Sequence, residues 1–188
     1  MNTIEKLLLV GVASCFILML MIFRLPDGLL HSWFLNIGQG DAALIRGPMG
    51  ELVLIDGGPD SKVMERMGAA IMPYEREIEL VVVSHPHADH LNGLLDVFKA
   101  YQVKNLLITG VKYEYAGYRE LVKMAEKNGT KIWYADGSFD FKIGRIGLDL
   151  IYPMTSMRGR SIENVNNSSI VMRVIYGDRK LLFSGDLE

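Results

Sequence analysis

Residues 79–90 read ELVVVSHPHADH, and this stretch decides how the rest of the chain is interpreted. Its first half is a short run of apolar, mostly β-branched residues, which is typical of a strand buried on both faces. Its second half places three of the four histidines of the chain, together with one aspartate, within six residues. A buried strand that runs directly into such a cluster predicts a metal site where the strand ends.

The spacing within this cluster predicts how the ligands divide. Residues two apart in an extended segment point the same way, so His85 and His87 can face one metal. Asp89 and His90 follow where the chain turns into a helix, and they can face a second metal beside the first. Imidazole nitrogens and carboxylate oxygens suit Zn²⁺, Mn²⁺ or iron. The alternative, a polar surface loop with chance histidines, is disfavoured by the density of the cluster.

Length and composition set the outer limits of the interpretation. The chain has 188 residues, a net charge of −2 and 49% apolar residues. These values are typical of one folded domain and exclude a disordered chain, a polybasic nucleic-acid arm and an acidic tail. The single cysteine, Cys15, excludes a disulfide framework and a cysteine-based zinc finger.

The N-terminal part of the chain is strongly apolar. Residues 7–23 carry no charge and lie between Lys6 and Arg24, and a helix of that length spans roughly 25 Å. We therefore expect residues 1–24 to be a single-pass membrane anchor, with the folded part outside the cytoplasm and residues 25–32 as a linker. A cleaved signal peptide, or a lipoprotein signal ending at Cys15, is the alternative.

Residues 33–188 are predicted to form one α/β domain, because strands flank a central region in which strands and helices alternate. Helices are predicted over 60–72, 91–101 and 118–128, and a mobile loop over 153–167. Strands are predicted over 31–37, 42–46, 51–55, 79–84, 105–109, 131–134, 139–143, 146–152, 169–176 and 180–184.

The hexad HPHADH at 85–90 resembles the signature of the metallo-β-lactamase superfamily. Four further stretches narrow the likeness to the C-terminal domain of ComEC-type competence proteins. They are FLNIGQGDA at 34–42, LIDGG at 54–58, NNSS at 166–169 and FSGD at 183–186. The resemblance covers residues 33–188 and implies an αββα sandwich with a metal site at one edge of two packed sheets.

The resemblance also implies roles for single residues, with one or two Zn²⁺ or Mn²⁺ ions as cofactor. His85 and His87 would bind the first metal, Asp89 and His90 the second, and Asp186 would bridge the two. Asp56 would be buried as an anchor for the histidine loop, and Asp41 of GQGD is a further candidate. Asp56 and Asp186 also fit ordinary turns, which is the alternative interpretation of both.

Some expected features of the superfamily are missing. A third histidine is expected before the strand that ends at Asp186, but Asn166 and Asn167 stand there. Asn36 replaces the acidic residue expected before GQGD. The chain also stops at Glu188, so we expect an incomplete domain that holds its metal weakly or holds one ion.

We therefore expect a membrane-anchored, metal-dependent hydrolase that attacks its substrate with a metal-activated hydroxide, with Asp89 orienting the water. The competence-type resemblance implies phosphodiester substrates, with single-stranded DNA the specific suggestion. The alternatives are a small-ester or lactam hydrolase and a non-catalytic module that binds metal or nucleic acid.

Overall fold

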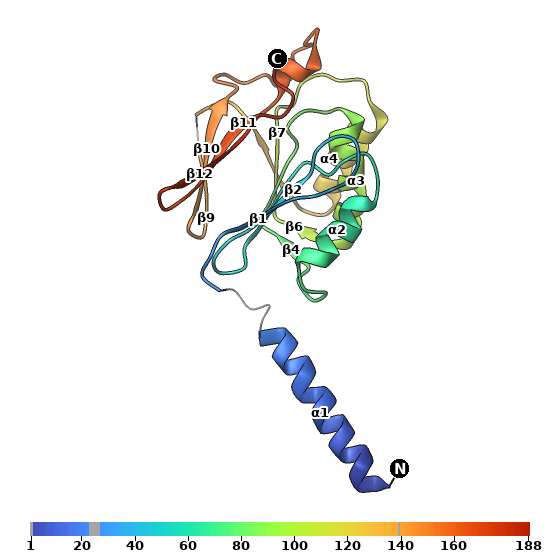
Figure 1. The fold of residues 1–188 in the computed structure, drawn as a ribbon. Helices are drawn as coiled ribbons and strands as arrows, with labels where there is room; N and C mark the ends of the chain where they lie inside the picture. The colour runs from blue at the N-terminus through green and yellow to red at the C-terminus, as the bar shows by residue number, and fades with distance from the viewer. Residues whose placement is uncertain (1, 23–26, 139) are drawn as a thin grey trace.

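A computed structural model describes residues 2–22, 27–138 and 140–188. Helix α1 (Thr3–Ile22) extends away from a domain built on two sheets (Figure 1). Within the described ranges, no helix combines the length and the apolar character that crossing a membrane requires. The predicted anchor and linker fall partly on residues 23–26, which lie outside the described residues.

The first sheet has six strands in the order β1-β2-β3-β5-β7-β8. The pairs β1–β2 and β2–β3 are antiparallel, whereas β3, β5, β7 and β8 run parallel. Parallel neighbours need crossover connections, and helices supply them here. The strands are β1 (His31–Phe34), β2 (Ala43–Arg46), β3 (Leu52–Ile55), β5 (Leu80–Val82), β7 (Asn105–Ile108) and β8 (Lys131–Tyr134).

Three helices pack on one face of this sheet (Figure 1). They are α2 (Lys62–Ala70), α3 (Ala88–Ala100) and α4 (Ala116–Lys127), which confirms the three predicted helices with slightly different ends. The apolar stripe of α3, including Leu91 and Leu94, is fully buried against sheet residues such as Leu54 and Val81. This packing holds the N-terminal end of α3, and with it His90, against the sheet.

The second sheet is antiparallel, in the order β12-β11-β10-β9. Its strands are β9 (Phe141–Ile143), β10 (Ile146–Tyr152), β11 (Val171–Tyr176) and β12 (Arg179–Phe183). Alternate residues such as Leu148 and Val174 face the first sheet and form a second core with Ile45, Val53 and Leu107. The alternation follows from the two-residue period of strands and agrees with the expected β-rich last third.

The described residues match the first three layers of the predicted, incomplete αββα sandwich. Among the described residues no helix covers the outer face of the second sheet, so the described layers are α, β and β (Figure 1). The side chains of this face are partly charged, and Arg173 forms an ion pair with Asp149 opposite it on β10. Such a face tolerates water because its charges remain solvated or paired.

Several local predictions need correction. The first strand ends at Phe34 instead of residue 37, and a small parallel pair, β4 (Glu77–Ile78) with β6 (Gln102–Val103), was not predicted. The segment 153–167, expected to be a mobile loop, ends within the 3₁₀ helix η1 (Val165–Ser168). Backbone hydrogen bonds also tie this segment to residues 110–112, because Gly159 N–H donates to the Gly110 carbonyl at 2.8 Å. Residue 139 of the predicted strand 139–143 lies outside the described residues.

Candidate metal centre

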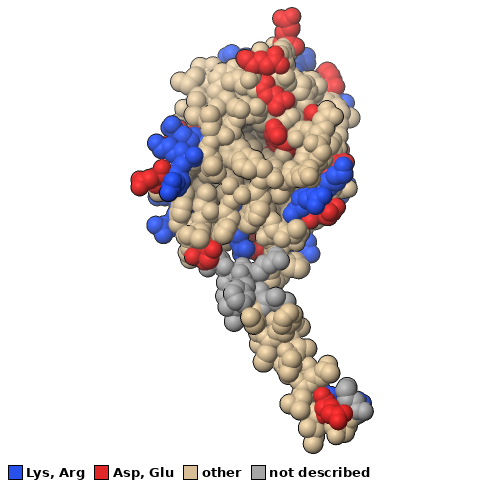
Figure 2. All heavy atoms as spheres, viewed as in Figure 1, with Lys and Arg blue, Asp and Glu red and all other residues tan. Residues whose placement is uncertain are grey.

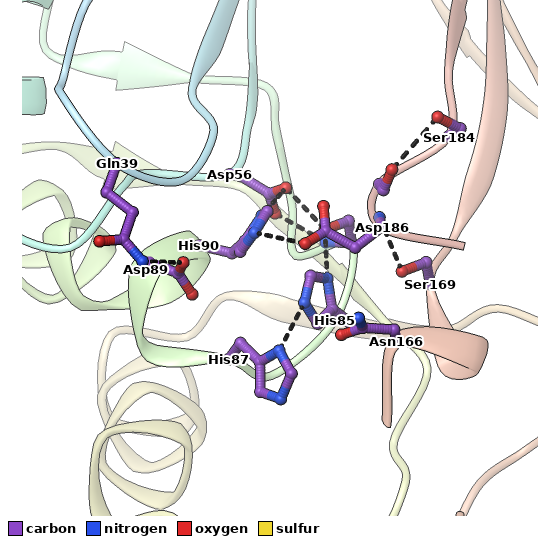
Figure 3. A network of polar contacts seen from close by, with 12 residues as sticks. Gln39, Asp56, His85, His87, Asp89, His90, Asn166, Ser169, Ser184 and Asp186 are labelled. Atoms are coloured by element: carbon purple, nitrogen blue, oxygen red, sulfur yellow. Dashed lines mark hydrogen bonds and ion pairs between the residues drawn. The ribbon is translucent and has the colours of Figure 1, made fainter. Parts of the chain in front are cut away.

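The candidate centre lies where strands of both sheets end (Figure 3). Asp56 follows β3, His85 follows β5, and His90 lies in the first turns of α3. Asp186 follows β12 of the second sheet. One ligand atom each of His85, His90 and Asp186 lies within 4.8 Å of the other two, so these three residues could hold a metal ion.

Asp56 organises the histidine loop from beneath. It is 2% exposed and has a positive φ of 56°, a conformation uncommon outside glycine but accessible to aspartate. Its Oδ1 accepts a hydrogen bond from the Ser84 N–H at 2.7 Å. Its Oδ2 accepts one from the Ser84 hydroxyl at 2.6 Å and lies 3.0 Å from Nδ1 of His90. One buried carboxylate therefore holds both ends of the loop.

The same network determines the proton position on His85. The Ser84 hydroxyl has one hydrogen and donates it to Asp56, so it accepts at its 3.1 Å contact with Nδ1 of His85. His85 then carries its hydrogen on Nδ1 and turns the Nε2 lone pair to the site. That Nε2 lies 3.0 Å from Nδ1 of His87. The two nitrogens converge as two ligands of one metal do, and Ser84 orients the His85 ring through its far nitrogen.

His90 and Asp186 meet on the opposite side of His85. Nε2 of His90 lies 3.5 Å from Oδ2 of Asp186, and the His85 and His90 ring centroids are 4.2 Å apart. The Asp186 backbone N–H donates to Oγ of Ser169 at 3.2 Å, which holds this turn against η1. The side chain of Asp186 is 41% exposed and forms the solvent side of the cluster.

The ionisable groups of the candidate centre differ in their pKa shifts. Burial opposes a charge on His90, but the hydrogen bond and charge of Asp56, with the charge of Asp186, raise the pKa of His90 to about 9. Burial and the charge of His90 lower the pKa of His85 to about 4. Burial also raises the pKa of Asp56, against the hydrogen bonds that it accepts.

The structure separates Asp89 from this group. Its Oδ2 accepts a hydrogen bond from Nε2 of Gln39 at 3.4 Å, and Figure 3 shows both side chains on the far side of His90 from Asp186. His87 is half-buried, and its ring contacts the ring of Tyr113 at 5.9 Å between centroids. The pairing of Asp89 with His90 on a second metal stays a prediction.

The GQGD loop packs closely on the start of α3. Gly40 has a φ of +74°, and a Cβ there would lie 1.8 Å from the Asp89 carbonyl oxygen. The Asp41 carbonyl accepts the Gly58 N–H at 3.0 Å, which joins this loop to the turn after Asp56. The glycine at position 40 is therefore required both by its backbone conformation and by the close approach.

A cavity of about 180 Å³ opens beside Asp56, between the ends of the two sheets. The rings of Phe34 and Phe183 stack at its wall with centroids 5.8 Å apart. The carboxylate-bearing residues Asp41 and Asp56 also line it, together with the turn at Ser184. Asp41 therefore contributes to this cavity, whereas the described metal-ligand group does not include it.

The two asparagines that occupy the expected histidine position differ. Oδ1 of Asn167 accepts the Glu188 N–H at 3.3 Å, and its carbonyl accepts the Tyr152 hydroxyl at 3.0 Å. Nδ2 of Asn166 donates to Oε1 of Glu188 at 3.0 Å. Figure 3 shows the side chain of Asn166 pointing toward His85.

The sequence analysis did not single out Ser84, Gln39, Ser169 or Glu188. Ser84 could have been found, because a hydroxyl directly before the first histidine of the motif is placed to orient it. Ser169 belongs to the NNSS stretch, which was noted without a role. Gln39 and Glu188 contact their partners across 50 and 22 residues, and no local pattern indicates such contacts.

The residues fit a divalent metal. Two imidazole nitrogens meet at 3.0 Å, and both His85 and His90 have their far nitrogen engaged by Ser84 or Asp56. Histidine and carboxylate donors are those that Zn²⁺ accepts in proteins.

Comparison with known proteins gives the family. The family model described as the metallo-beta-lactamase superfamily matches residues 35–188. No curated protein matches the chain. Among solved structures, the chain is similar to the metallo-beta-lactamase fold protein YhfI from Bacillus subtilis, with 17% identity and a TM-score of 0.52. That match covers 83% of this chain and 62% of YhfI.

A second similar structure is a metallo-beta-lactamase from Cronobacter sakazakii with a HARLDQ motif. It is 16% identical with a TM-score of 0.55, over 88% of this chain and 64% of that enzyme. The chain thus spans a little over three fifths of each of these two proteins. At such identities the likeness shows the fold, and the family-model match over most of the chain shows that it belongs to the metallo-β-lactamase superfamily.

Proposed function

We propose that this protein is a metal-dependent hydrolase whose centre is formed by His85, His87, His90 and Asp186. The observation that carries the proposal is the convergence of His85, His90 and Asp186 from two sheets and a helix over a buried anchor, Asp56. Elements distant in the sequence meet here with ligand atoms inward, as a working site requires.

The residues of the chain orient the reaction. A bound divalent metal supplies Lewis acidity and lowers the pKa of a water toward about 7. Asp56 and Ser84 keep the His85 and His90 rings in one orientation through their far nitrogens. Asp186, exposed to solvent, is the carboxylate best placed to accept a proton at the site.

We propose a phosphodiester as substrate, with single-stranded DNA as the first to test, on the basis of the competence-type resemblance. A second observation supports an anionic substrate. Tyr113 contacts His87, and the preceding residue, Lys112, donates its backbone N–H to the Arg160 carbonyl at 2.8 Å. On that joined loop the Arg158 guanidinium stacks on Tyr134 at 4.0 Å. Cations and aromatic rings on a loop joined to the Tyr113 segment suit phosphates and bases.

The test uses the purified full chain with Zn²⁺ or Mn²⁺ and a chromogenic phosphodiester, a labelled single strand, a small ester and a lactam. We expect cleavage of the phosphodiester and the single strand, and its loss in His87→Ala and Asp186→Asn. Turnover of the ester or lactam alone would overturn the substrate proposal. Metal binding without any turnover would overturn the enzymatic proposal and indicate a metal-binding module.

We also propose that α1 holds the protein at a membrane, as a separate point from catalysis. Its large apolar side chains are exposed all round, with Leu7, Val12 and Phe16 each at least 60% exposed. Figure 2 shows charged residues of α1 only near its N-terminal end. A helix that is apolar on every side needs an apolar environment. The full chain should remain with membranes after alkaline extraction, and release into the supernatant would contradict this.

A further inference from the structure

Asn166 carries a buried oxygen without a hydrogen bond. Its Oδ1 accepts none from any residue that the structure describes, although the atom is shielded from solvent. Buried polar atoms in folded proteins are almost always satisfied, so an exception beside a cluster of metal ligands indicates a partner that is not a protein group.

The orientation of this amide is determined by Glu188. An ionised carboxylate accepts hydrogen bonds and cannot donate them. Oε1 of Glu188 lies 3.0 Å from Nδ2 of Asn166, and Oε2 lies 2.9 Å from Nδ2 of Asn164. The NH₂ group of Asn166 must therefore face Glu188, which leaves its oxygen facing away from that carboxylate.

The backbone places Asn166 near the histidine loop. Asn166 lies in η1, and Oδ1 of Asn164 accepts the Asn166 N–H at 3.1 Å at the start of that turn. Directly after η1, the Ile170 N–H donates to the Ser84 carbonyl at 2.9 Å, next to His85. Figure 3 shows the Asn166 side chain turned toward His85. Asn167 is the weaker candidate for this role, because its Oδ1 already has a partner in the Glu188 N–H.

We infer that Asn166 Oδ1 is a metal ligand of the His85–His87 side of the centre, and that Glu188 is the positioning residue that presents it. This inference rests on the proposed metal-dependent function and adds the metal preference of the site. A neutral carbonyl oxygen in place of a further imidazole makes the donor set harder, which favours Mn²⁺ relative to Zn²⁺. The preference is a relative one, since divalent zinc binds more tightly than manganese to most sites.

The experiment measures Mn²⁺ affinity by electron paramagnetic resonance and Zn²⁺ affinity by competition with a chromophoric chelator, on the metal-free full chain. Asn166→His should lower the ratio of Mn²⁺ to Zn²⁺ affinity by about tenfold or more, and Asn166→Ala should weaken Mn²⁺ binding by about tenfold. Glu188→Gln, at an exposed position, should lower the Mn²⁺ affinity as well, because glutamine no longer dictates which end of the amide faces it. Glu163→Gln, at an exposed acidic position just before η1, is the matched control and should bind both metals as the unaltered chain does.

The outcomes separate this inference from the proposed function. If the unaltered chain binds neither metal, both fail. If it binds metal and both Asn166 variants keep its two affinities, the ligand role is wrong while the proposed function stands. If only Glu188→Gln behaves as the unaltered chain, the positioning role of Glu188 is wrong. Thermal unfolding of each variant identifies a loss of metal binding that is due to unfolding. If both Asn166 variants are unfolded, the Mn²⁺ affinity of the exposed Glu188→Gln variant tests whether the Asn166 amide binds metal.

Discussion

Asp56 and His90 form a buried pair, with Oδ2 of the carboxylate 3.0 Å from Nδ1 of the ring and both side chains 2% exposed. The pair joins the end of β3 to the start of α3, two elements 34 residues apart. It therefore couples the folding of the first sheet to the placement of a ligand, because His90 can turn Nε2 to Asp186 only while Nδ1 is held.

Replacing Asp56 tests this coupling. In Asp56→Asn the charge is lost and an NH₂ group meets donors of Ser84 and His90, so we expect the free energy of unfolding to fall by about 3–5 kcal/mol. Zn²⁺ affinity should fall with it by about 10–100-fold. Urea unfolding and calorimetric titration measure the two effects. Asp60→Asn, exposed and outside the cluster, is the control and should stay within about 0.5 kcal/mol; equal losses in both variants would contradict the anchoring role.

Ser84→Ala tests the proton position on His85. Without the hydroxyl, Nδ1 of His85 loses its partner and the ring is free to present either nitrogen, so metal affinity should fall by about tenfold with the fold retained. Nitrogen-15 NMR of the histidine rings reports the tautomer directly. Ser184→Ala removes a hydroxyl that donates to the neighbouring Gly185 carbonyl at 3.2 Å and serves as the control. An unchanged His85 tautomer in Ser84→Ala would exclude this role.

Gly40→Ala tests the close packing of the GQGD loop on α3. The added methyl group would meet the Asp89 carbonyl at 1.8 Å, and we expect a loss of stability of about 3 kcal/mol or more. Gly129 has nearly the same φ, +72°, but nothing within 4 Å of the added Cβ. Gly129→Ala should therefore show the backbone strain alone, about 1 kcal/mol. Similar losses at the two positions, measured by thermal unfolding, would show that the contact with Asp89 is unimportant.

The buried hydroxyl of Tyr118 should make the stability of the fold depend on pH in the alkaline range. Burial, and then the charge of Tyr134, raise the pKa of Tyr118 to about 12 from its ordinary value of 10.0. Between these two values the unfolded chain has lost the proton and the folded chain keeps it. The contribution of Tyr118 is therefore complete below pH 10 and is lost as the pH rises to 12, by about 2–3 kcal/mol. Stability curves of Tyr118→Phe should fall less over this range, and identical curves would contradict the assignment.

Much of the fold was open to prediction from local patterns. The helices α2, α3 and α4 and most strands follow from apolar periodicity, since each buries one face against a sheet. The stacking of the layers was harder to predict, because local patterns do not show which elements, if any, cover the outer face of the second sheet. The loop over 153–167 was predicted, but its 3₁₀ helix and its backbone hydrogen bonds to residues 110–112 were not, because those partners lie far along the chain.

The sequence by itself determined the chemistry that is available: an apolar strand ending in His85 and His87, with acids after two other strands. These are properties of neighbouring residues, and the geometry of a strand and a helix is sufficient to relate them. The tertiary structure decided which groups meet. It brought Asp186 to His90, turned Asp89 to Gln39, and left the Asn166 oxygen buried without a hydrogen bond. Those relations depend on how two sheets pack, and packing joins residues that no local spacing connects.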